Sequence, residues 1–303
     1  MSDCMTMRPA TAVIVTYQSV RTIAATLAAV RRCHAAGLLD CIIVDNASTD
    51  GTQSLLQSES SWASVILTGK NLGFGRGCNV GLAKVQSPYT LFLNPDASIE
   101  PQAFRTLLEF LEGNPRVGIV GPATICGPDE NNTSLQVSGS LPLPSFTAET
   151  RMHQIEPGTA PFRTGWVCGA VFLVRTELMT RLGGFDPRFF LYFEETDVCA
   201  RASALGYETW AVGTAVARHI GSASSPGEEA LRFGCIPRHY YQSRRYYMIK
   251  HHGWLRATAA ETLELPKLAL QSLADLLRAR RSSRLLQRLK ARPFSLPPRV
   301  SGP

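Results

Sequence analysis

The sequence predicts an α/β protein with a mainly parallel sheet covered by helices on both faces. Two observations support this prediction. Short, continuously apolar runs, typical of strands buried on both faces, alternate with stretches in which apolar residues recur at helical spacing. The chain of 303 residues is also long enough for one large domain of this class with a C-terminal helical appendage.

Strands and helices alternate regularly up to residue 121. The expected strands are residues 12–17, 41–44, 65–67, 89–93 and 117–121. The expected helices are residues 20–34, a short helix that ends near residue 56, and residues 74–85 and 103–111. This alternation favours right-handed crossovers and therefore parallel neighbours in the sheet.

The pattern weakens after residue 121. Residues 127–164 are rich in Gly, Pro, Ser, Thr and Asn, which predicts a long excursion of the kind that often borders a functional site. The later expected elements are one or two strands in residues 166–174, helices at 177–182 and 194–205, a strand at 208–217, and one or two helices in 255–289.

Composition excludes several classes of protein. With 45% apolar and 18% charged residues the chain is of ordinary globular type, and no run of 18 apolar residues predicts a membrane-spanning helix. The N-terminus lacks the basic and apolar regions of a signal peptide. The eight cysteines are scattered without a Cys-x-x-Cys pair, so we expect reduced thiols and a cytoplasmic location.

The net charge of +7 is concentrated at the C-terminal end. The basic residues there, with no acid among them, are Arg278, Arg280, Arg281, Arg284, Arg288, Lys290, Arg292 and Arg299. Residues 1–275 therefore carry a net charge of −1. The basic segment could pack on the main domain with a solvated face, or lie as an interfacial helix on anionic lipid. We expect no nucleic-acid partner, because no recognition motif is present and the rest of the chain is nearly neutral.

Residues 91–96, Leu-Phe-Leu-Asn-Pro-Asp, contain the most informative acid of the chain. Pro95 cannot donate to a sheet ladder, so the strand should end at Asn94 and place Asp96 at the carboxyl end of a buried strand. Ligands bind at that edge of open α/β sheets. Asp96 could therefore cap the helix expected at 103–111, or hold a hard divalent cation against a phosphate.

Three carboxylates, Glu194, Glu195 and Asp197, stand at the start of an expected helix. Acids at this position complement the helix dipole, which accounts for one of the three. Three crowded like charges after an aromatic run predict a tuned acid–base site.

Two loops and a histidine are weaker candidates. Asp45 follows the second strand and could belong to an ordinary capping turn or accept hydrogen bonds from a base or ribose. The glycine-rich residues 70–81 include Asn71 and Gly73 and would let the backbone approach a ligand closely, although they match neither the dinucleotide fingerprint nor the P-loop. His219, taken alone, is more often an ordinary surface or core residue than a metal ligand.

In this order and spacing, the motifs resemble those of the inverting glycosyltransferases of family two. The resemblance implies the GT-A fold, a Rossmann-like mixed, mainly parallel sheet with helices on both faces, here with a C-terminal helical appendage. The resemblance covers residues 10–225, and it is strongest to rhamnosyltransferase-type members, to which residues 239–253 are also similar. The motifs are Val15-Thr16-Tyr17, Asp45-Asn46-x-Ser48-x-Asp50-Gly51, Asn71-x-Gly73-Phe74, Asn94-Pro95-Asp96, Gly169-Ala170, Phe193-Glu194-Glu195-x-Asp197 and His219. We accordingly expect a catalytic domain at 1–225 and a helical, basic segment at 226–303.

The resemblance implies a role for each of these residues. The residues that would bind the nucleotide-sugar are Thr16, Tyr17, Asp45, Asn71, Gly73, Asn94, Asp96, Gly169 and Ala170. Asp96 and His219 would hold Mg²⁺ or Mn²⁺, and Asn94 replaces the first acid of the family's Asp-x-Asp motif, which removes one charge. Glu195 matches the general base, with Glu194 and Asp197 as further catalytic candidates.

These roles are chemically consistent. The metal ion would offset the charge on the departing diphosphate, while a carboxylate on the opposite face of the sugar takes the proton of the attacking hydroxyl. In-line attack inverts the anomeric carbon and needs one base, in contrast to the two carboxyl groups of glycoside hydrolysis.

The resemblance implies transfer of L-rhamnose from dTDP-rhamnose to a glycan or polyprenyl-diphosphate-linked acceptor in cell-surface polysaccharide synthesis, at the inner face of the cytoplasmic membrane. One alternative is a UDP-sugar donor carrying galactofuranose, glucose or N-acetylglucosamine. The other is a catalytically silent GT-A scaffold at the membrane. A silent domain should have lost Asp96 or Glu195, and both are present.

Overall fold

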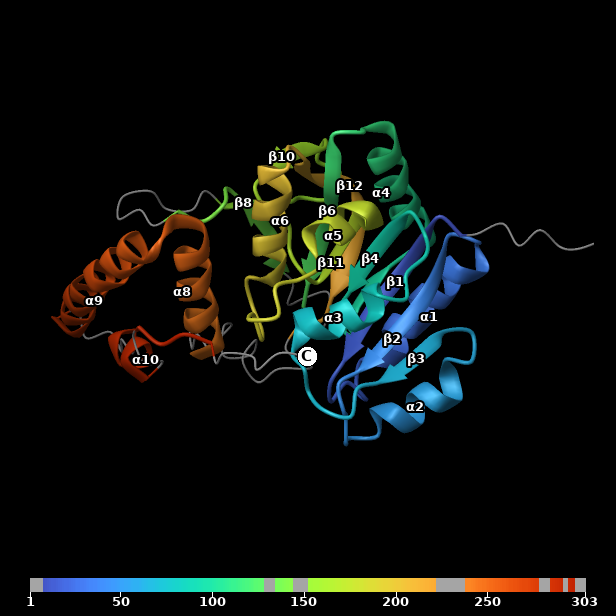
Figure 1. Cartoon of the computed structure of the whole chain (residues 1–303), viewed down its shortest axis with the longest axis horizontal. Helices are drawn as coiled ribbons and strands as arrows, with labels where there is room; N and C mark the ends of the chain where they lie inside the picture. The colour runs from blue at the N-terminus through green and yellow to red at the C-terminus, as the bar shows by residue number, and fades with distance from the viewer. Residues whose placement is uncertain are drawn as a thin grey trace, which may run out of the picture.

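A computed structural model of the chain describes residues 8–127, 134–143, 152–221, 238–277, 284–290 and 294–297. It confirms the expected class: a mixed sheet of ten strands carries helices on both faces (Figure 1). The strand order is β10-β12-β6-β11-β4-β1-β2-β3, with β5 paired to β12 and β7 paired to β6.

The body of the sheet is mainly parallel. Its long strands are β1 (Ala10–Thr16), β2 (Leu39–Asp45), β3 (Ser64–Leu67), β4 (Tyr89–Leu93), β6 (Val117–Cys126), β11 (Val171–Arg175) and β12 (Glu208–His219). β3, β2, β1 and β4 pair in parallel, and β11 runs antiparallel between β4 and β6. Because β12 pairs in parallel with β6, these two strands point the same way as β4.

Helices bury both faces of this sheet, which explains why the strand sequences are apolar without alternation. The helices are α1 (Ile23–Ala35), α2 (Thr52–Glu59), α3 (Phe74–Leu82), α4 (Pro101–Gly113), α5 (Thr176–Leu182) and α6 (Glu194–Ala204). Successive residues of a strand point to opposite faces. In β1, Ile14 belongs to the core that contains Leu27 of α1, whereas Val15 belongs to the core that contains Cys78 of α3.

The structure differs from the sequence expectation in three places. Residues 166–174 are not one continuous strand, since β11 begins at Val171 and the residues just before it turn along the carboxyl edge of the sheet. The excursion after residue 127 contains short strands, which are β7 (Ser134–Leu135), β8 (Val137–Gly139), β9 (Met152–Gln154) and β10 (Phe162–Thr164). The three-residue strand β5 (Ala97–Ile99) was also not expected, because so short an element carries no periodic pattern.

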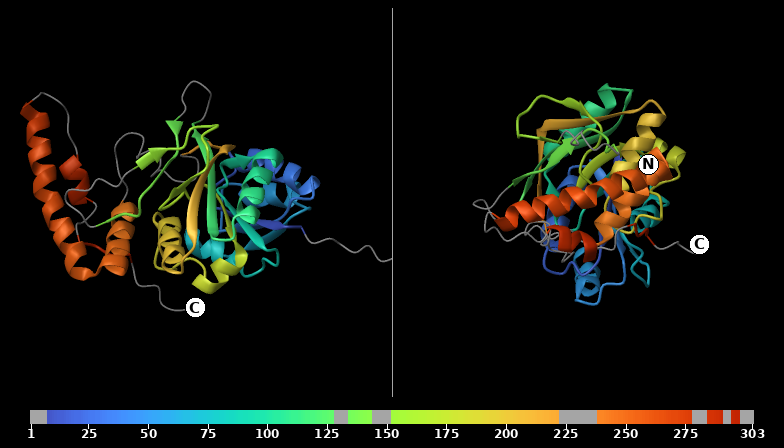
Figure 2. Two further views of the ribbon diagram at one scale, coloured as in Figure 1. Left: turned by 90° about the horizontal axis from the view of Figure 1, so that it is seen from above. Right: turned by 90° about the vertical axis from the view of Figure 1, so that its left-hand side faces the viewer.

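Three helices of the C-terminal segment stand at one end of the molecule (Figures 1 and 2). They are α8 (Arg238–His252), α9 (Trp254–Leu277) and α10 (Arg284–Lys290). α8 packs on the main body through an aromatic cluster of Phe189, Phe193, Tyr246 and Tyr247. The expected boundary between residues 225 and 226 lies outside the described residues. Among those residues, no helix is both long and apolar enough to cross a membrane.

α9 turns its apolar side outward. Leu255, Leu270 and Leu277 are 76%, 69% and 81% exposed, and Leu263 and Leu273 are exposed with them. α9 packs on α8 through its opposite side, where Ala257 and Glu261 are buried. The acids of its inner side are instead paired with arginines: Glu261 with Arg245 and Arg288, and Glu264 with Arg244.

Candidate active site

A cavity of about 500 Å³ opens at the carboxyl edge of the sheet, where β1 and β4 end. Its wall contains both Asp96 and Glu195, although 99 positions separate them in the chain. The other predicted site residues in the wall are Tyr17, Asn71, Gly73, Asn94, Gly169, Ala170, Glu194 and His219.

Asp96 and His219 form a buried pair in this wall. The Nε2 atom of His219 lies 3.1 Å from Oδ1 of Asp96, and both residues are almost inaccessible to solvent. β12 positions the histidine, because His219 pairs with Ala97 of β5 immediately after Asp96. The alternative that Asp96 caps the next helix is wrong, since α4 begins at Pro101 and its N-cap residue is Glu100.

The donor atoms at this edge suit a divalent cation that arrives with a phosphate. The pair supplies one carboxylate and one imidazole, and Asn94 stands next to it in the cavity wall. In the described part of the chain, no cluster of three or more His, Cys, Asp or Glu side chains could hold a metal. Mg²⁺ is commonly bound by one or two carboxylates together with substrate phosphates and water, so a site of this kind fits a cation shared with a diphosphate.

The start of α6 aims two glutamates at the same cavity. Tyr192 and Phe193, just before the helix, have positive φ angles of 72° and 70°. Such backbone is uncommon for bulky residues and costs on the order of 1–3 kcal/mol at each position, so the surrounding packing must hold it. This turn reverses the chain so that Glu194 and Glu195, the first residues of α6, both line the cavity.

Glu195 is half-buried beside the backbone of residue 169. A Cβ atom added to Gly169 would lie 3.5 Å from Oε2 of Glu195, so the glycine leaves this side of the carboxylate uncrowded. Thr196 donates its hydroxyl hydrogen to Oε1 of Glu195 at 3.3 Å. Burial raises the pKa of Glu195. A raised pKa makes a carboxylate a better acceptor for the proton of a hydroxyl group at neutral pH.

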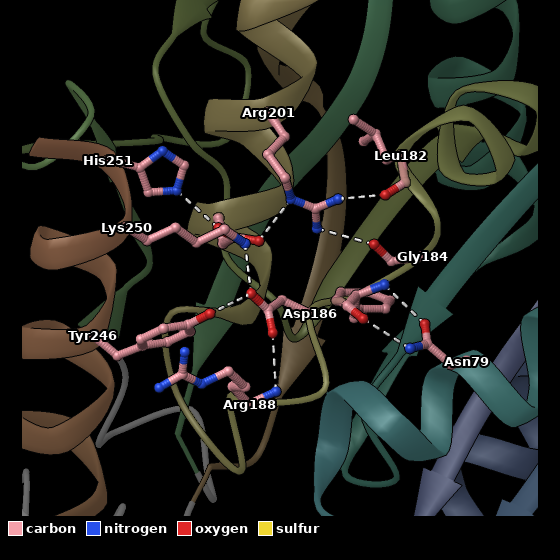
Figure 3. A network of polar contacts seen from close by, with 11 residues as sticks. Asn79, Leu182, Gly184, Asp186, Arg188, Arg201, Tyr246, Lys250 and His251 are labelled. Carbon is pink, nitrogen blue, oxygen red and sulfur yellow. Dashed lines mark hydrogen bonds and ion pairs between the residues drawn. The ribbon is translucent and has the colours of Figure 1, made fainter. Parts of the chain in front are cut away.

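Asp197 does not belong to this cavity. Its carboxylate is fully buried elsewhere, where it meets Arg201 at 2.7 Å, Lys250 at 2.8 Å and His251 at 2.8 Å. These three partners are labelled in Figure 3. Burial alone would raise the pKa of Asp197, but His251, Arg201 and Lys250 outweigh burial and lower it. We therefore correct its assignment from catalytic candidate to structural anchor.

Thr16 and Asp45 lie behind the cavity instead of in its described wall. Both are fully buried, and the Thr16 hydroxyl donates to Oδ2 of Asp45 at 2.8 Å. The other oxygen of Asp45 accepts from the Ser48 N–H at 2.9 Å and from Gln53 Nε2 at 2.7 Å. These three donors occupy most of the acceptor sites of the carboxylate, and direct contact of Asp45 with a base or ribose stays a prediction.

Gly73 lets the loop before α3 pack closely against the backbone of Phe190 in the cavity wall. It has a φ angle of +84°, and a Cβ atom there would come within 2.5 Å of the carbonyl oxygen of Phe190. The N–H of Phe74 donates to that oxygen at 3.1 Å, and Asn46 Nδ2 donates to the Gly73 carbonyl at 3.0 Å. This position therefore requires glycine for packing as well as for approach to a ligand.

Several residues of the wall were not predicted from the sequence. They are Val15, Asn46, Phe74, Pro95, Gln136, Cys168, Phe190, Leu191, Tyr192 and His239. The aromatic run at 189–193 was visible in the sequence, and Asn46 lies inside a quoted motif. His239 begins the stretch 239–253 that was quoted for the resemblance, but no role was predicted for it. It comes from α8 and reaches the cavity through tertiary packing, with its ring 5.1 Å from that of Phe190.

The fold and the cavity define a glycosyltransferase of the GT-A class. The sequence matches the model of glycosyl transferase family 2 over residues 11–178. This match covers more than half of the chain, and the protein belongs to that family.

Known relatives agree with this assignment. Over 256 residues the chain is 27% identical to the N-acetylglucosaminyl-diphospho-decaprenol L-rhamnosyltransferase of Mycobacterium tuberculosis, which covers 76% of this chain and 81% of the relative. It is 28% identical to the rhamnosyltransferase WbbL of Escherichia coli, over 46% of this chain and 58% of the relative.

Two solved structures show the same fold at low sequence identity. One is the mannosyltransferase PcManGT from Pyrobaculum calidifontis in complex with GDP-Man and Mn²⁺, with a TM-score of 0.56, 17% identity, and coverage of 95% of this chain and 86% of that one. The other is S. aureus TarS 1–349, with a TM-score of 0.57, 12% identity, and coverage of 94% and 79%.

Proposed function

We propose that this glycosyltransferase moves L-rhamnose from dTDP-L-rhamnose to a glycan or polyprenyl-diphosphate-linked acceptor, with inversion, in the synthesis of a cell-surface polysaccharide. The observation that carries the proposal is the shared cavity, which has the Asp96–His219 pair and the Glu195 carboxylate in one wall. The rhamnosyltransferase relatives support the choice of sugar, and the diphospho-decaprenol in one relative's name supports the choice of acceptor.

The metal ligands and the base would act on opposite sides of the anomeric carbon. Asp96 and His219 would hold Mg²⁺ or Mn²⁺ against the diphosphate, with Asn94 as a neutral neighbour. The cation, when bound, offsets the negative charge that builds on the departing diphosphate. Glu195 would accept the proton of the acceptor hydroxyl as that oxygen attacks. Tyr17, Asn71 and Gly73 would bind the nucleoside, with Thr16 and Asp45 supporting their loops from behind.

Removal of the cation should test the first of these roles. We expect a chelator to abolish transfer and added Mn²⁺ or Mg²⁺ to restore it. Because residue 94 is Asn, the Asp96 carboxylate is the protein's single formal charge in the proposed metal site, so a chelator should remove the cation readily. Asp96→Asn should weaken Mn²⁺ binding and leave the fold intact. Full activity in metal-free enzyme would contradict a metal-dependent mechanism.

The donor can be identified by ligand-induced stabilisation. A ligand that binds the folded state at about 100 times its Kd adds about 2.7 kcal/mol of stability. We expect dTDP-rhamnose with Mn²⁺ to raise the Tm most within a panel that also contains UDP-galactofuranose, UDP-glucose and UDP-N-acetylglucosamine. A larger shift with a UDP-sugar would move the assignment to a uridine donor. Binding without turnover of any donor would favour the silent scaffold.

The outer face of α9 suits a location at the inner surface of the cytoplasmic membrane. Its exposed leucines form a row, and the basic side chains of Arg256 and Lys267 are exposed on the same helix. The acids Glu261 and Glu264 are turned inward to arginines. An amphipathic helix with this arrangement binds an anionic bilayer through apolar burial and charge attraction.

The membrane contact proposed here does not depend on the arginines of the C-terminal tail. Arg288 is buried against Glu261, and Arg278, Arg280, Arg281, Arg292 and Arg299 lie outside the described residues. Flotation with vesicles rich in phosphatidylglycerol tests the proposal. The double variant Leu263→Glu and Leu270→Glu should lose vesicle binding, whereas Leu67→Glu, an equally exposed leucine of β3, should keep it. Unchanged binding of the double variant would contradict docking through α9.

A further inference from the structure

Glu194 has an unsatisfied oxygen atom at the cavity. The residue is 2% exposed and belongs to the cavity wall, yet no described group forms a hydrogen bond with its buried Oε1 atom. A buried polar atom without a partner costs free energy, and a buried unpaired charge costs far more. An atom of this kind at a substrate cavity indicates a partner that the substrate supplies.

The surroundings of Glu194 favour its neutral form. On the α3 side its Cγ atom lies close to Gly75, where an added Cβ would be 3.3 Å away, and the titratable neighbour on α3 is the buried thiol of Cys78. Burial raises the pKa of Glu194 first of all, and Glu195 and Asp197 raise it further, which outweighs the opposing effect of its own backbone N–H. His239 from α8 and Tyr17 from the loop after β1 are exposed titratable residues of the same cavity wall, and Asp96 and His219 are buried ones.

We propose that Glu194 acts as a neutral positioning residue, whose carboxyl group forms a hydrogen bond with a hydroxyl group of the sugar ring held in the cavity. A protonated carboxyl group offers one donor and one acceptor, and a sugar hydroxyl offers the same pair, so the two can satisfy each other. The inference rests on the proposed function, because it takes a glycosyl group as the occupant of the cavity.

This assignment separates the duties of two adjacent glutamates. Glu195 receives the proton of the acceptor hydroxyl while the oxygen of that hydroxyl forms the new bond to the anomeric carbon. The bond from that carbon to the diphosphate oxygen breaks, and its electron pair leaves with the diphosphate. Glu194 gains and loses no proton in this sequence; it fixes the orientation of the ring during the attack. The attacking side of the cavity then carries one negative charge instead of two.

Replacing each glutamate by glutamine should give opposite results. Glutamine has the size of glutamate and is neutral, so Glu194→Gln should keep kcat and KM within a few-fold of the wild type. Glu194→Ala should lower kcat/KM roughly 10- to 100-fold, the range expected when one hydrogen bond to a buried group is lost. Glu195→Gln should lower kcat by roughly 10²–10⁴, the usual contribution of a general base.

We would measure kcat and KM for these variants with dTDP-rhamnose and a synthetic N-acetylglucosaminyl-diphospho-lipid over a range of pH. Towards alkaline pH the wild type should lose activity as Glu194 ionises, and Glu194→Gln should lose less. Glu194→Gln that is as inactive as Glu195→Gln would overturn the proposal, because the negative charge would then be required. Wild-type kinetics in Glu194→Ala would overturn it as well, because no positioning contact would then exist.

Infrared difference spectroscopy gives a readout that does not depend on the donor. At neutral pH the wild type and Glu195→Gln should show the C=O stretch of a protonated carboxylic acid, and Glu194→Gln should lack it. If the wild type lacks this C=O band, or Glu194→Gln still shows it, the proposal is wrong whatever the substrate is. If the band is present but dTDP-rhamnose is not turned over, the proposed donor is wrong and the assignment of Glu194 stands.

Discussion

The two sides of the first turn of α6 use carboxylates in opposite ways. On the cavity side, Glu194 and Glu195 have no ion pair among the described residues, and burial raises the pKa of both. On the side that faces α8, Asp197 is also buried, yet its pKa is lowered because His251, Arg201 and Lys250 contact its carboxylate. Burial therefore does not decide the charge of these acids; the presence of a partner does.

Contacts on the side that faces α8 also hold the cavity wall in place. Asp186, in the loop before α6, accepts hydrogen bonds from Lys250 at 2.6 Å and from Tyr246 at 2.8 Å (Figure 3). Ser243 donates to the carbonyl oxygen of Leu191 at 2.8 Å. Since all three donors come from α8, the C-terminal segment fixes the loop that carries Phe190, Leu191 and Tyr192. The expected division at residue 225 thus separates two parts that share one site.

The largest effect on activity should come from the cavity side of α6, where the glutamates have no ion pair among the described residues. Glu195→Gln removes the proposed base and should reduce transfer by roughly 10²–10⁴, whereas its Tm should stay within a few degrees of the wild type because no ion pair is lost. Glu195→Asp, which keeps the charge but shortens the side chain, is the matched control and should keep part of the activity. Transfer at the wild-type rate by Glu195→Gln would end its assignment as the base.

On the side that faces α8 the effect should appear in stability. Asp197→Asn leaves Arg201, Lys250 and His251 without their common anion, and breaking a buried pair in this way costs about 3–5 kcal/mol. The three partner side chains are partly exposed, so we expect the lower end of that range. Thermal unfolding should show a Tm lower by several degrees. If Asp197→Asn instead loses turnover with an unchanged Tm, Asp197 returns to the catalytic set.

A smaller loss should follow from Lys250→Met. Asp197 keeps Arg201 and His251, and Asp186 keeps Tyr246, so no acid is left without a partner. The side chain of Lys250 is also 24% exposed, which screens its interactions. We expect a cost of about 1 kcal/mol in the free energy of unfolding, measured by urea denaturation. A cost as large as that of Asp197→Asn would mean that the lysine alone holds α8 in place.

The smallest effect is a pH dependence with opposite sign on the two sides. The pKa of Glu194 is raised in the folded state, so the wild type should lose stability relative to Glu194→Gln as the pH rises above 4.5, the ordinary value for this group. The pKa of Asp197 is lowered, so its stabilising contribution is present above 3.8 and disappears as the pH falls. Tm values measured from acid to neutral pH would reveal both trends, and parallel curves for all variants would contradict them.

Local patterns predicted the fold well, because continuous apolar runs and helical spacing are properties of neighbouring residues. The pairing of Asp96 with His219, 123 positions apart, came only from the resemblance to a family. Asp197 was misassigned because two of its three side-chain partners belong to α8, more than 50 positions away, although Arg201 was visible one helical turn further on. The leucines of α9 predicted an apolar face, but no local property could say that this face points outward.

The central claim is that one cavity holds the diphosphate and the base on opposite sides of the anomeric carbon. A crystal structure with dTDP-rhamnose and Mn²⁺ tests it most directly. The account predicts Mn²⁺ bound by Asp96, His219 and the diphosphate, with the anomeric carbon between that ion and the Glu195 carboxylate. A sugar nucleotide bound outside this cavity, or with its anomeric carbon turned away from Glu195, would contradict it.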